Sequence, residues 1–197
     1  MSPMTLRHAA KVLLGKALRP LHAGEGKLIA LQREVLPARE LVLHSDAFEL
    51  GGWIPRRHAG PGEGDNLSPP MHWSTPPKQT RELLLLCEDP DAPALHPLIH
   101  WMLRIPPTMT RLPEGLPAQV EPDAVPGVVQ GPNGANSYGY FGMLPPPGHG
   151  PHHYYFELFA LDQPIELPAR GDHGHLLAAL AGHVLAEGHH IGLYERN

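Results

Sequence analysis

Two carboxylates and a histidine stand at the two ends of a turn rich in proline. Asp89 and Asp91 follow an apolar run in CEDPDAP, and His100 comes nine residues after Asp91, where a second apolar run begins. Pro90 and Pro93 have no backbone N–H, so the chain must leave the middle of a sheet here. A carboxylate fixed at a strand end can orient an imidazole and favour its charged form. The alternative is structural, since Asp in turns also accepts hydrogen bonds from loop amides.

A second polar cluster lies in YFGMLPPPGHGPHHYYF, residues 140–156. His152 and Tyr154 are two apart, so an extended chain presents an imidazole and a phenol on one face. Prolines stiffen the preceding loop, and its glycines let the backbone turn sharply or approach a ligand closely.

Other chemistries find less support in the sequence. Histidines and aspartates are numerous enough to bind a metal ion, but HExxH and cysteine pairs with zinc spacing are absent, so we expect no metal and no cofactor. There is no GxSxG motif, and the single cysteine, Cys87, lies in an apolar run typical of the core. General acid–base catalysis by His100, His152 and Asp89, as in a hydrolase or isomerase, remains an alternative.

The composition predicts one folded, turn-rich domain. The 197 residues include 25 prolines and 21 glycines, together with apolar runs that a disordered chain would lack. The net charge of −5 does not indicate nucleic-acid binding. One cysteine suggests a reducing compartment, and no apolar run reaches the roughly 20 residues that span a bilayer. Basic residues interrupt the N-terminal apolar stretch, so we expect no signal peptide and a cytoplasmic protein.

Extended segments must position the two polar clusters. The continuous apolar run at 81–89 predicts a strand buried on both faces, and 99–106 and 152–162 predict two further strands. A helix is expected over 172–187, with Gly188 as its C-terminal stop. Shorter strands are expected at 40–45, 48–55, 71–75 and 189–196, and residues 106–139 are expected to form long connections.

The first predicted element is an amphipathic helix over residues 4–21. Leucines and alanines recur at intervals of three and four, and basic residues occupy the remaining face. Such a helix can lie on an anionic membrane. Its apolar stripe lacks Trp and Phe, so we expect it to pack against its own domain or a second subunit, and a homodimer is among the expected partners.

Taken together, these motifs resemble the phosphatidylethanolamine-binding protein family, also called the Raf kinase inhibitor protein family. The resemblance covers about residues 40–195. The six-residue spacer between DAP and HW is similar to the bacterial branch. The matching segments are GEGDNLSPPMHW (62–73), CEDPDAP (87–93), HW (100–101) and GYFGMLPPPGHGPHHYYFELFALD (139–162).

The resemblance implies a mainly β fold, with a large antiparallel sheet packed on a smaller one and a C-terminal helix nearby. It implies a domain over 39–197, preceded by an N-terminal extension over 1–38 that contains the amphipathic helix. It also implies a cis Ala92–Pro93 bond and a pocket for phosphate, acetate or phospholipid head groups. The implied ligand-binding residues are Asp89, Asp91, His100, Gly142, Leu144, Pro145, Pro146, His152 and Tyr154.

The function expected from this resemblance is non-catalytic binding of a small anion or phosphorylated ligand. Inhibition of a kinase or protease through a protein contact is the alternative that some relatives suggest. Because two imidazoles would face the anion, we expect its affinity to fall as pH rises from about 5.5 to 8. The chain departs from the family at His153, where Arg is usual, and at Leu98 and Ile99, where bacterial members carry aromatic residues.

Overall fold

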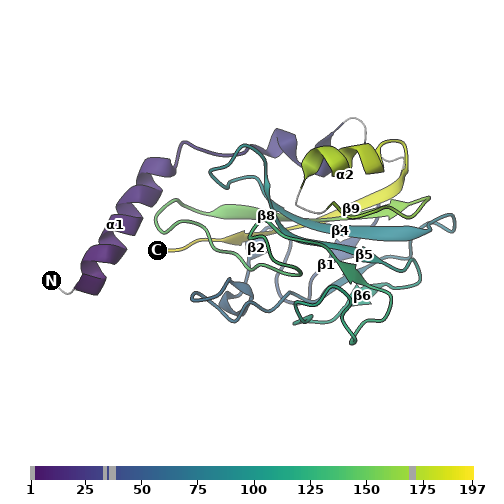
Figure 1. The fold of residues 1–197 in the computed structure, drawn as a ribbon, viewed down its shortest axis with the longest axis horizontal. Helices are drawn as coiled ribbons and strands as arrows, with labels where there is room; N and C mark the ends of the chain where they lie inside the picture. The colour runs from purple at the N-terminus through teal and green to yellow at the C-terminus, as the bar shows by residue number, and fades with distance from the viewer. Residues whose placement is uncertain (1–2, 33–34, 36–38, 169–171) are drawn as a thin grey trace.

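Two β-sheets form the centre of the fold (Figure 1). A computed structural model of the chain describes residues 3–32, 35, 39–168 and 172–197. In chain order the elements are α1 (Pro3–Leu18), the 3-10 helices η1 (Glu25–Lys27) and η2 (Ile29–Leu31), β1 (Leu43–His44), β2 (Gly52–Trp53), the 3-10 helix η3 (Arg56–His58), β3 (Met71–Trp73), β4 (Glu82–Asp89), β5 (Leu98–Ile105), β6 (Arg111–Leu112), β7 (Val129–Gln130), β8 (His152–Leu161), α2 (His173–Leu180) and β9 (Val184–Tyr194).

The larger sheet has the strand order β2-β9-β8-β4-β5-β7, and the smaller one has the order β1-β3-β6. All the pairs are antiparallel except β2 with β9. The three long strands expected from apolar runs are present as β4, β5 and β8, and β4 is buried on both faces as predicted. The mainly β class and the two packed sheets are therefore confirmed.

Alternating side chains of β4 supply two cores on opposite faces of the large sheet. Leu83 and Leu85 point into the core that the small sheet covers. Leu84 and Leu86 point into the second core, which is completed by α2 and η2. Figure 1 shows α2 on one side of the large sheet. This two-sided burial explains why the run has no polar alternation.

The C-terminal helix is shorter than the sequence indicated. It ends at Leu180 rather than 187, and Gly188 lies inside β9, so the predicted helix end was wrong. Gly182 adopts φ +76°, a left-handed conformation that glycine accommodates and that stops the helix. Val184 then pairs with Leu161 of β8, so strand pairing overrides the helical period of the following residues.

The Ala92–Pro93 bond corrects another expectation. No cis peptide bond occurs among the described residues, so this bond is trans. The turn closes without a cis bond, because Ala94 N–H donates to Ala92 O at 2.8 Å and Asp91 N–H donates to Asp89 Oδ1 at 2.9 Å. The trans form is also intrinsically favoured by about 0.5–1 kcal/mol.

Helix α1 is formed as predicted but ends at Leu18, before Pro20. Three of its four leucines, Leu6, Leu13 and Leu14, are exposed rather than buried on its own domain. In the part of the chain that the structure describes, no helix is both long enough and apolar enough to cross a bilayer.

Candidate functional site

The ends of three neighbouring strands bring the predicted polar residues together. Asp89 is the last residue of β4, His100 lies near the start of β5, and His152 opens β8. A register shift between Cys87 and Glu88 in the β4–β5 pair changes the facing of the side chains that follow. Antiparallel pairing places the end of β4 beside the starts of both neighbours, which is why residues far apart in the sequence meet here.

Asp89 is the centre of this cluster. Its Oδ2 lies 2.7 Å from His152 Nδ1 and 3.9 Å from His100 Nε2, and both imidazoles are almost fully buried. Because a carboxylate only accepts, His152 donates through Nδ1 and turns Nε2 toward the interior of the site. Asp89 thus fixes the tautomer of His152.

Asp91 faces the rim rather than the interior. Its Oδ2 accepts from the backbone N–H of His153 at 2.7 Å and lies 2.8 Å from His153 Nδ1. Its Oδ1 lies 3.3 Å from Nδ1 of His22. Asp91 therefore orients neighbouring chain segments, and His153 engages a carboxylate at the position where the family usually has Arg.

His100 is held on two sides. Its Nδ1 donates to the carbonyl oxygen of Phe141 at 2.7 Å, and its ring stacks on the Phe141 ring at 5.4 Å between centroids. Burial lowers the pKa of His100 below its usual range, although the nearby Asp89 charge acts in the opposite direction. The remaining ring nitrogen, Nε2, is buried and has no hydrogen-bond partner among the described residues.

Tyr154 closes the floor of the site. Its ring meets the His100 ring edge-on at 5.1 Å between centroids, and the side chain is fully buried. Its hydroxyl also lacks a hydrogen-bond partner within the described part of the chain. Burial, followed by the Asp89 charge, raises the pKa of Tyr154 well above its usual range, so the hydroxyl keeps its proton and can donate.

A fifth side chain, His149, fills the space in front of His152. Its Nδ1 lies 2.8 Å from His152 Nε2, and its Nε2 lies 3.0 Å from the carbonyl oxygen of Leu18 at the end of α1. Asp89, His100, His152 and Tyr154 are each at most 2% exposed. The site is therefore closed in this structure.

The hydrogen bonds of His149 require one shared proton. The Leu18 carbonyl and the Asp89 carboxylate both only accept, so His149 Nε2 and His152 Nδ1 must both donate. The contact between the two rings then needs one further proton between their facing nitrogens. Burial lowers the pKa of His149, which weakens this arrangement as pH rises.

Residues 18–24 lie over the same opening. Ala23 N–H donates to Ala92 O at 3.0 Å, and Gly24 N–H donates to Pro90 O at 2.9 Å. The predicted extension thus forms backbone hydrogen bonds with the proline-rich turn beside Asp89. These contacts join segments about 70 residues apart, and no local sequence signal indicates them.

The predicted rim, Gly142 to Pro146, forms a supporting wall. Gly142 N–H donates to Asn66 Oδ1 at 2.8 Å, and a Cβ at Gly142 would clash with the carbonyl oxygen of His58. Pro145 O accepts from Arg196 at 3.2 Å. Leu144 and Pro146 are partly buried in the same wall.

Sequence reasoning missed three contributors to the site. The motifs and spacings in the sequence assign no role at the site to His149, Phe141 or Leu18. The GHG triplet at 148–150, an imidazole between two glycines of positive φ, is the signal that could have pointed to His149. Among the described residues, no group of three or more His, Cys, Asp or Glu side chains is arranged to hold a metal ion.

Comparison with known proteins shows the family of the chain. Residues 44–195 match the family described as phosphatidylethanolamine-binding protein. The chain belongs to the phosphatidylethanolamine-binding protein family. A UPF0098 protein of Methanothermobacter thermautotrophicus is 42% identical over 156 residues, covering 78% of this chain and 98% of that protein.

Two crystal structures share the fold. Escherichia coli YbcL, described as a new member of the mammalian phosphatidylethanolamine-binding protein family, has a TM-score of 0.71 and 32% identity, with 80% of this chain and 99% of YbcL covered. CT736 of Chlamydia trachomatis, described as a putative homolog of the same family, has a TM-score of 0.68 and 33% identity, with 81% and 100% covered. Relatives thus occur in archaea and bacteria.

Proposed function

We propose that this protein binds a small anion or phosphorylated ligand in the site formed by Asp89, His100, His152 and Tyr154, and that it does so without catalysing a reaction. The observation that carries the proposal is the pair of buried polar atoms without partners among the described residues, His100 Nε2 and Tyr154 Oη. Leaving such a group unsatisfied costs about 1–3 kcal/mol. A ligand that accepts hydrogen bonds from both atoms would recover that cost.

An anion suits these donors better than a neutral ligand does. Tyr154 donates through its hydroxyl, and His152 and His100 each donate through Nε2 when they are protonated. Asp89 would repel an anion if it stood alone, but its Oδ2 is hydrogen-bonded to His152 Nδ1, which leaves His152 Nε2 to face the ligand. The same carboxylate could accept from the ammonium group of an ethanolamine head group.

His149 occupies the position that the ligand would take at His152 Nε2. Binding must therefore move the His149 ring and break its contact with Leu18 O. A phosphate oxygen is a stronger acceptor for His152 than an imidazole, because the hydrogen bond is charge-assisted. The proposal thus includes a ligand that replaces His149.

Titration calorimetry with dimethyl phosphate, with acetate and with glycerophosphoethanolamine tests this function. Tyr154→Phe should weaken the affinity for dimethyl phosphate about tenfold, since one donor is lost. Tyr138→Phe is the matched control, because Tyr138 is exposed and lies outside the site. Equal affinity in the wild type and Tyr154→Phe, or no binding of any probe, would contradict the proposal.

The site supports binding rather than turnover because no activated nucleophile adjoins it among the described residues. Burial raises the pKa of the Cys87 thiol well above its usual range, which keeps it in the unreactive thiol form. This buried single cysteine also suits the cytoplasmic location that we propose. Release of nitrophenol from phosphoester substrates, abolished by His152→Gln, would favour the acid–base hydrolase instead.

A protein-binding role is the second candidate. The exposed leucines of α1 favour it, since contiguous apolar surface on a folded protein commonly marks an interaction site. Kinase or protease inhibition is one form that this role could take. Pull-downs with and without saturating dimethyl phosphate separate two places where a partner could bind. A partner lost when the anion is present would bind at the anion site, and a partner that is retained would bind at α1.

A further inference from the structure

Helix α1 contacts its own domain through one face only. Gly15 is buried against the 147–149 loop, and a Cβ there would clash with the carbonyl oxygen of Pro147. Val12 lies against Gly148, and Arg19 Nε donates to Gly148 O at 2.9 Å. Residues 12 and 15 share one side of the helix, and Arg19 directly follows its last residue.

The leucines of α1 lie on the opposite side. Leu6, Leu13 and Leu14 are 61%, 67% and 60% exposed, and Ala10 and Ala17 continue the same stripe. Figure 1 shows α1 extending away from the sheets at one end of the molecule. The apolar stripe therefore faces away from the domain to which the helix is attached.

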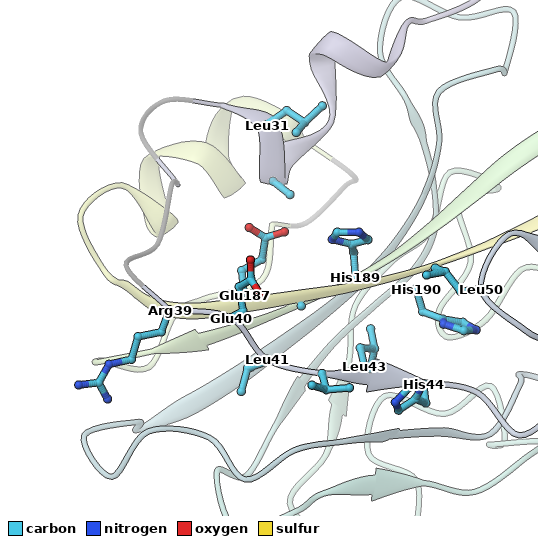
Figure 2. A pocket seen from close by; sticks show the side chains of 13 residues that line it. Leu31, Arg39, Glu40, Leu41, Leu43, His44, Leu50, Glu187, His189 and His190 are labelled. Carbon is cyan, nitrogen blue, oxygen red and sulfur yellow. The ribbon is translucent and has the colours of Figure 1, made fainter.

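A groove with a mixed apolar and polar lining lies elsewhere on the molecule, between η2, residues 39–44 and β9 (Figure 2). Its volume is about 760 Å³. Leu31, Val42 and Leu50 line it and are each more than half exposed. Of the eleven large hydrophobic side chains that are exposed among the described residues, six fall on this groove or on the α1 stripe.

Two carboxylates stand in this groove. Figure 2 shows Glu40 and Glu187 close together, with Arg39 pointing away from them. Within the described ranges, neither has a cationic side chain within 4 Å. Burial, followed by the charge of Glu40, raises the pKa of Glu187. A cation placed here would relieve both the burial cost and the mutual repulsion.

The charges of the helix and of the remaining chain are opposite. Residues 3–18 contain Arg7, Lys11 and Lys16 and no acidic residue, so they contribute +3 to a chain of net charge −5, and the other residues carry −8. Arg7 and Lys11 precede Leu14 by seven and three positions, so they flank it on the helix surface. The helix thus presents leucines next to cations, as the groove presents leucines next to carboxylates.

We propose that α1 of one copy docks in this groove of a second copy, with Leu13 and Leu14 against the apolar lining and Lys11 facing Glu187. The 147–149 loop holds the opposite face of the helix, so the leucine stripe cannot turn toward the groove of the same chain. Every copy carries one helix and one groove, so two copies can exchange helices reciprocally about a two-fold axis and satisfy both surfaces. This dimer does not depend on the anion site.

Sedimentation velocity of the full chain over about 1–100 µM tests the proposal, because dimerisation is concentration-dependent. We expect a dimer for the wild type. Lys11→Glu and Glu187→Lys should each weaken it at least about tenfold, since a two-fold dimer contains each change twice. Lys78→Glu, which is exposed and lies outside both α1 and the groove, is the charge control, and exposed Leu95→Ser is the apolar control for Leu13→Ser.

Mixing the two charge-reversal variants gives the decisive result. In a mixed dimer, the substituted helix meets the substituted groove at one contact, and both residues are native at the other. The mixture should therefore recover dimerisation to within about threefold of the wild type. A wild-type monomer at every concentration, or a dimer insensitive to Lys11→Glu and Leu13→Ser, would overturn the proposal. A mixture that dimerises no more strongly than either variant alone would also overturn the proposal.

A membrane is the competing occupant of the helix stripe. Flotation with vesicles of phosphatidylserine and phosphatidylcholine measures it directly. Binding that Leu13→Ser abolishes, in a protein that sediments as a monomer, would assign the stripe to lipid and overturn the dimer. Absence of vesicle binding by a wild-type dimer is the expected outcome.

Discussion

At the scale of single residues, the site is defined by which polar atoms are satisfied and which are not. Asp89 has both oxygens engaged, one by His152 and the other by the backbone of Asp91. His100 Nε2 and Tyr154 Oη, buried beside it, have no hydrogen-bond partner in the described chain. Each such atom left unpaired costs about 1–3 kcal/mol, which a ligand bonded to both would recover.

The pH dependence of anion affinity follows from His100. Its free-state pKa is lowered by burial, and a bound anion stabilises the imidazolium, so the bound-state pKa is the higher of the two. Affinity is then greatest below the free-state pKa and is lost as pH rises through the bound-state pKa. We expect calorimetry with dimethyl phosphate, whose charge is constant, to show weakening affinity between about pH 5.5 and 8.

This profile is best measured in a His149→Ala background, where the shared proton of the His149–His152 pair does not contribute. His100→Gln in that background should make the profile less steep, because His152 remains as the second imidazole donor. A profile that is flat before the His100 substitution, or unchanged after it, would show that His100 is not a charged donor.

His149 itself is expected to oppose binding. Replacing it with alanine removes two hydrogen bonds that the ligand must otherwise break, each worth about 0.5–1.5 kcal/mol. The affinity of His149→Ala for dimethyl phosphate should therefore rise roughly tenfold or more. His153→Ala, which removes a ring bonded to Asp91 on the rim, is the control. Weaker binding by His149→Ala would instead make His149 a ligand contact.

At the scale of elements, the attachment of α1 depends on close backbone approach at Gly15. Alanine would ordinarily favour a helix over glycine by about 0.8–1.0 kcal/mol. At Gly15 the added Cβ would clash with Pro147 O, so the helix must move off the loop. Gly15→Ala should therefore speed hydrogen exchange of the Ala23 and Gly24 amides, which bond to the proline-rich turn.

Gly26→Ala is the matched control, because a Cβ there meets nothing within 4 Å. Slower exchange at Ala23 and Gly24 in Gly15→Ala than in the wild type would mean that helix propensity dominates and that the contact is unimportant.

A second element-level prediction concerns the far face of the large sheet. Glu157 on β8 is fully buried beside Glu88 on β4, and burial raises its pKa well above the usual range, with the Glu88 charge adding to the effect. A raised carboxyl pKa means that the folded state favours the protonated form. Stability is therefore lost as pH rises from the unfolded-state pKa through the folded-state pKa.

Glu157→Gln replaces the acid with a neutral side chain of the same shape. The free energy of unfolding of this variant, relative to that of the wild type, should increase as pH rises from about 4.3 to about 8. The lower value is the ordinary pKa of a glutamate side chain. Urea unfolding at several pH values measures this, with exposed Glu121→Gln as the control. A difference independent of pH would contradict a protonated Glu157.

At the scale of the whole molecule, the sequence predicted what is local and repetitive. The long strands were predictable because Leu83 to Leu86 are buried on both faces, which leaves a continuous apolar run. Asp89, His100, His152 and Tyr154 could be singled out because strand ends and two-residue spacing are visible in the sequence, and the structure places these four side chains together. The end of α2 was misplaced, because pairing of Val184 with β8 is a non-local event.

The closure of the site could not be predicted for the same reason. His149, Leu18 and the backbone of Ala23 and Gly24 meet the Asp89 turn only after the chain has folded, across separations of about 70 to 130 residues. Nothing in the composition of residues 18–24 distinguishes a segment that covers a site from an ordinary linker. Only the three-dimensional structure brings the N-terminal extension onto the site.

The central claim is that a small anion binds in the closed site by replacing His149. A crystal structure of the protein grown with dimethyl phosphate tests it most directly. We predict density for the anion within hydrogen-bond distance of His100 Nε2, His152 Nε2 and Tyr154 Oη, with the His149 ring moved away from His152. A saturated crystal in which the His149–His152 contact persists and the anion is absent from this site would contradict the claim.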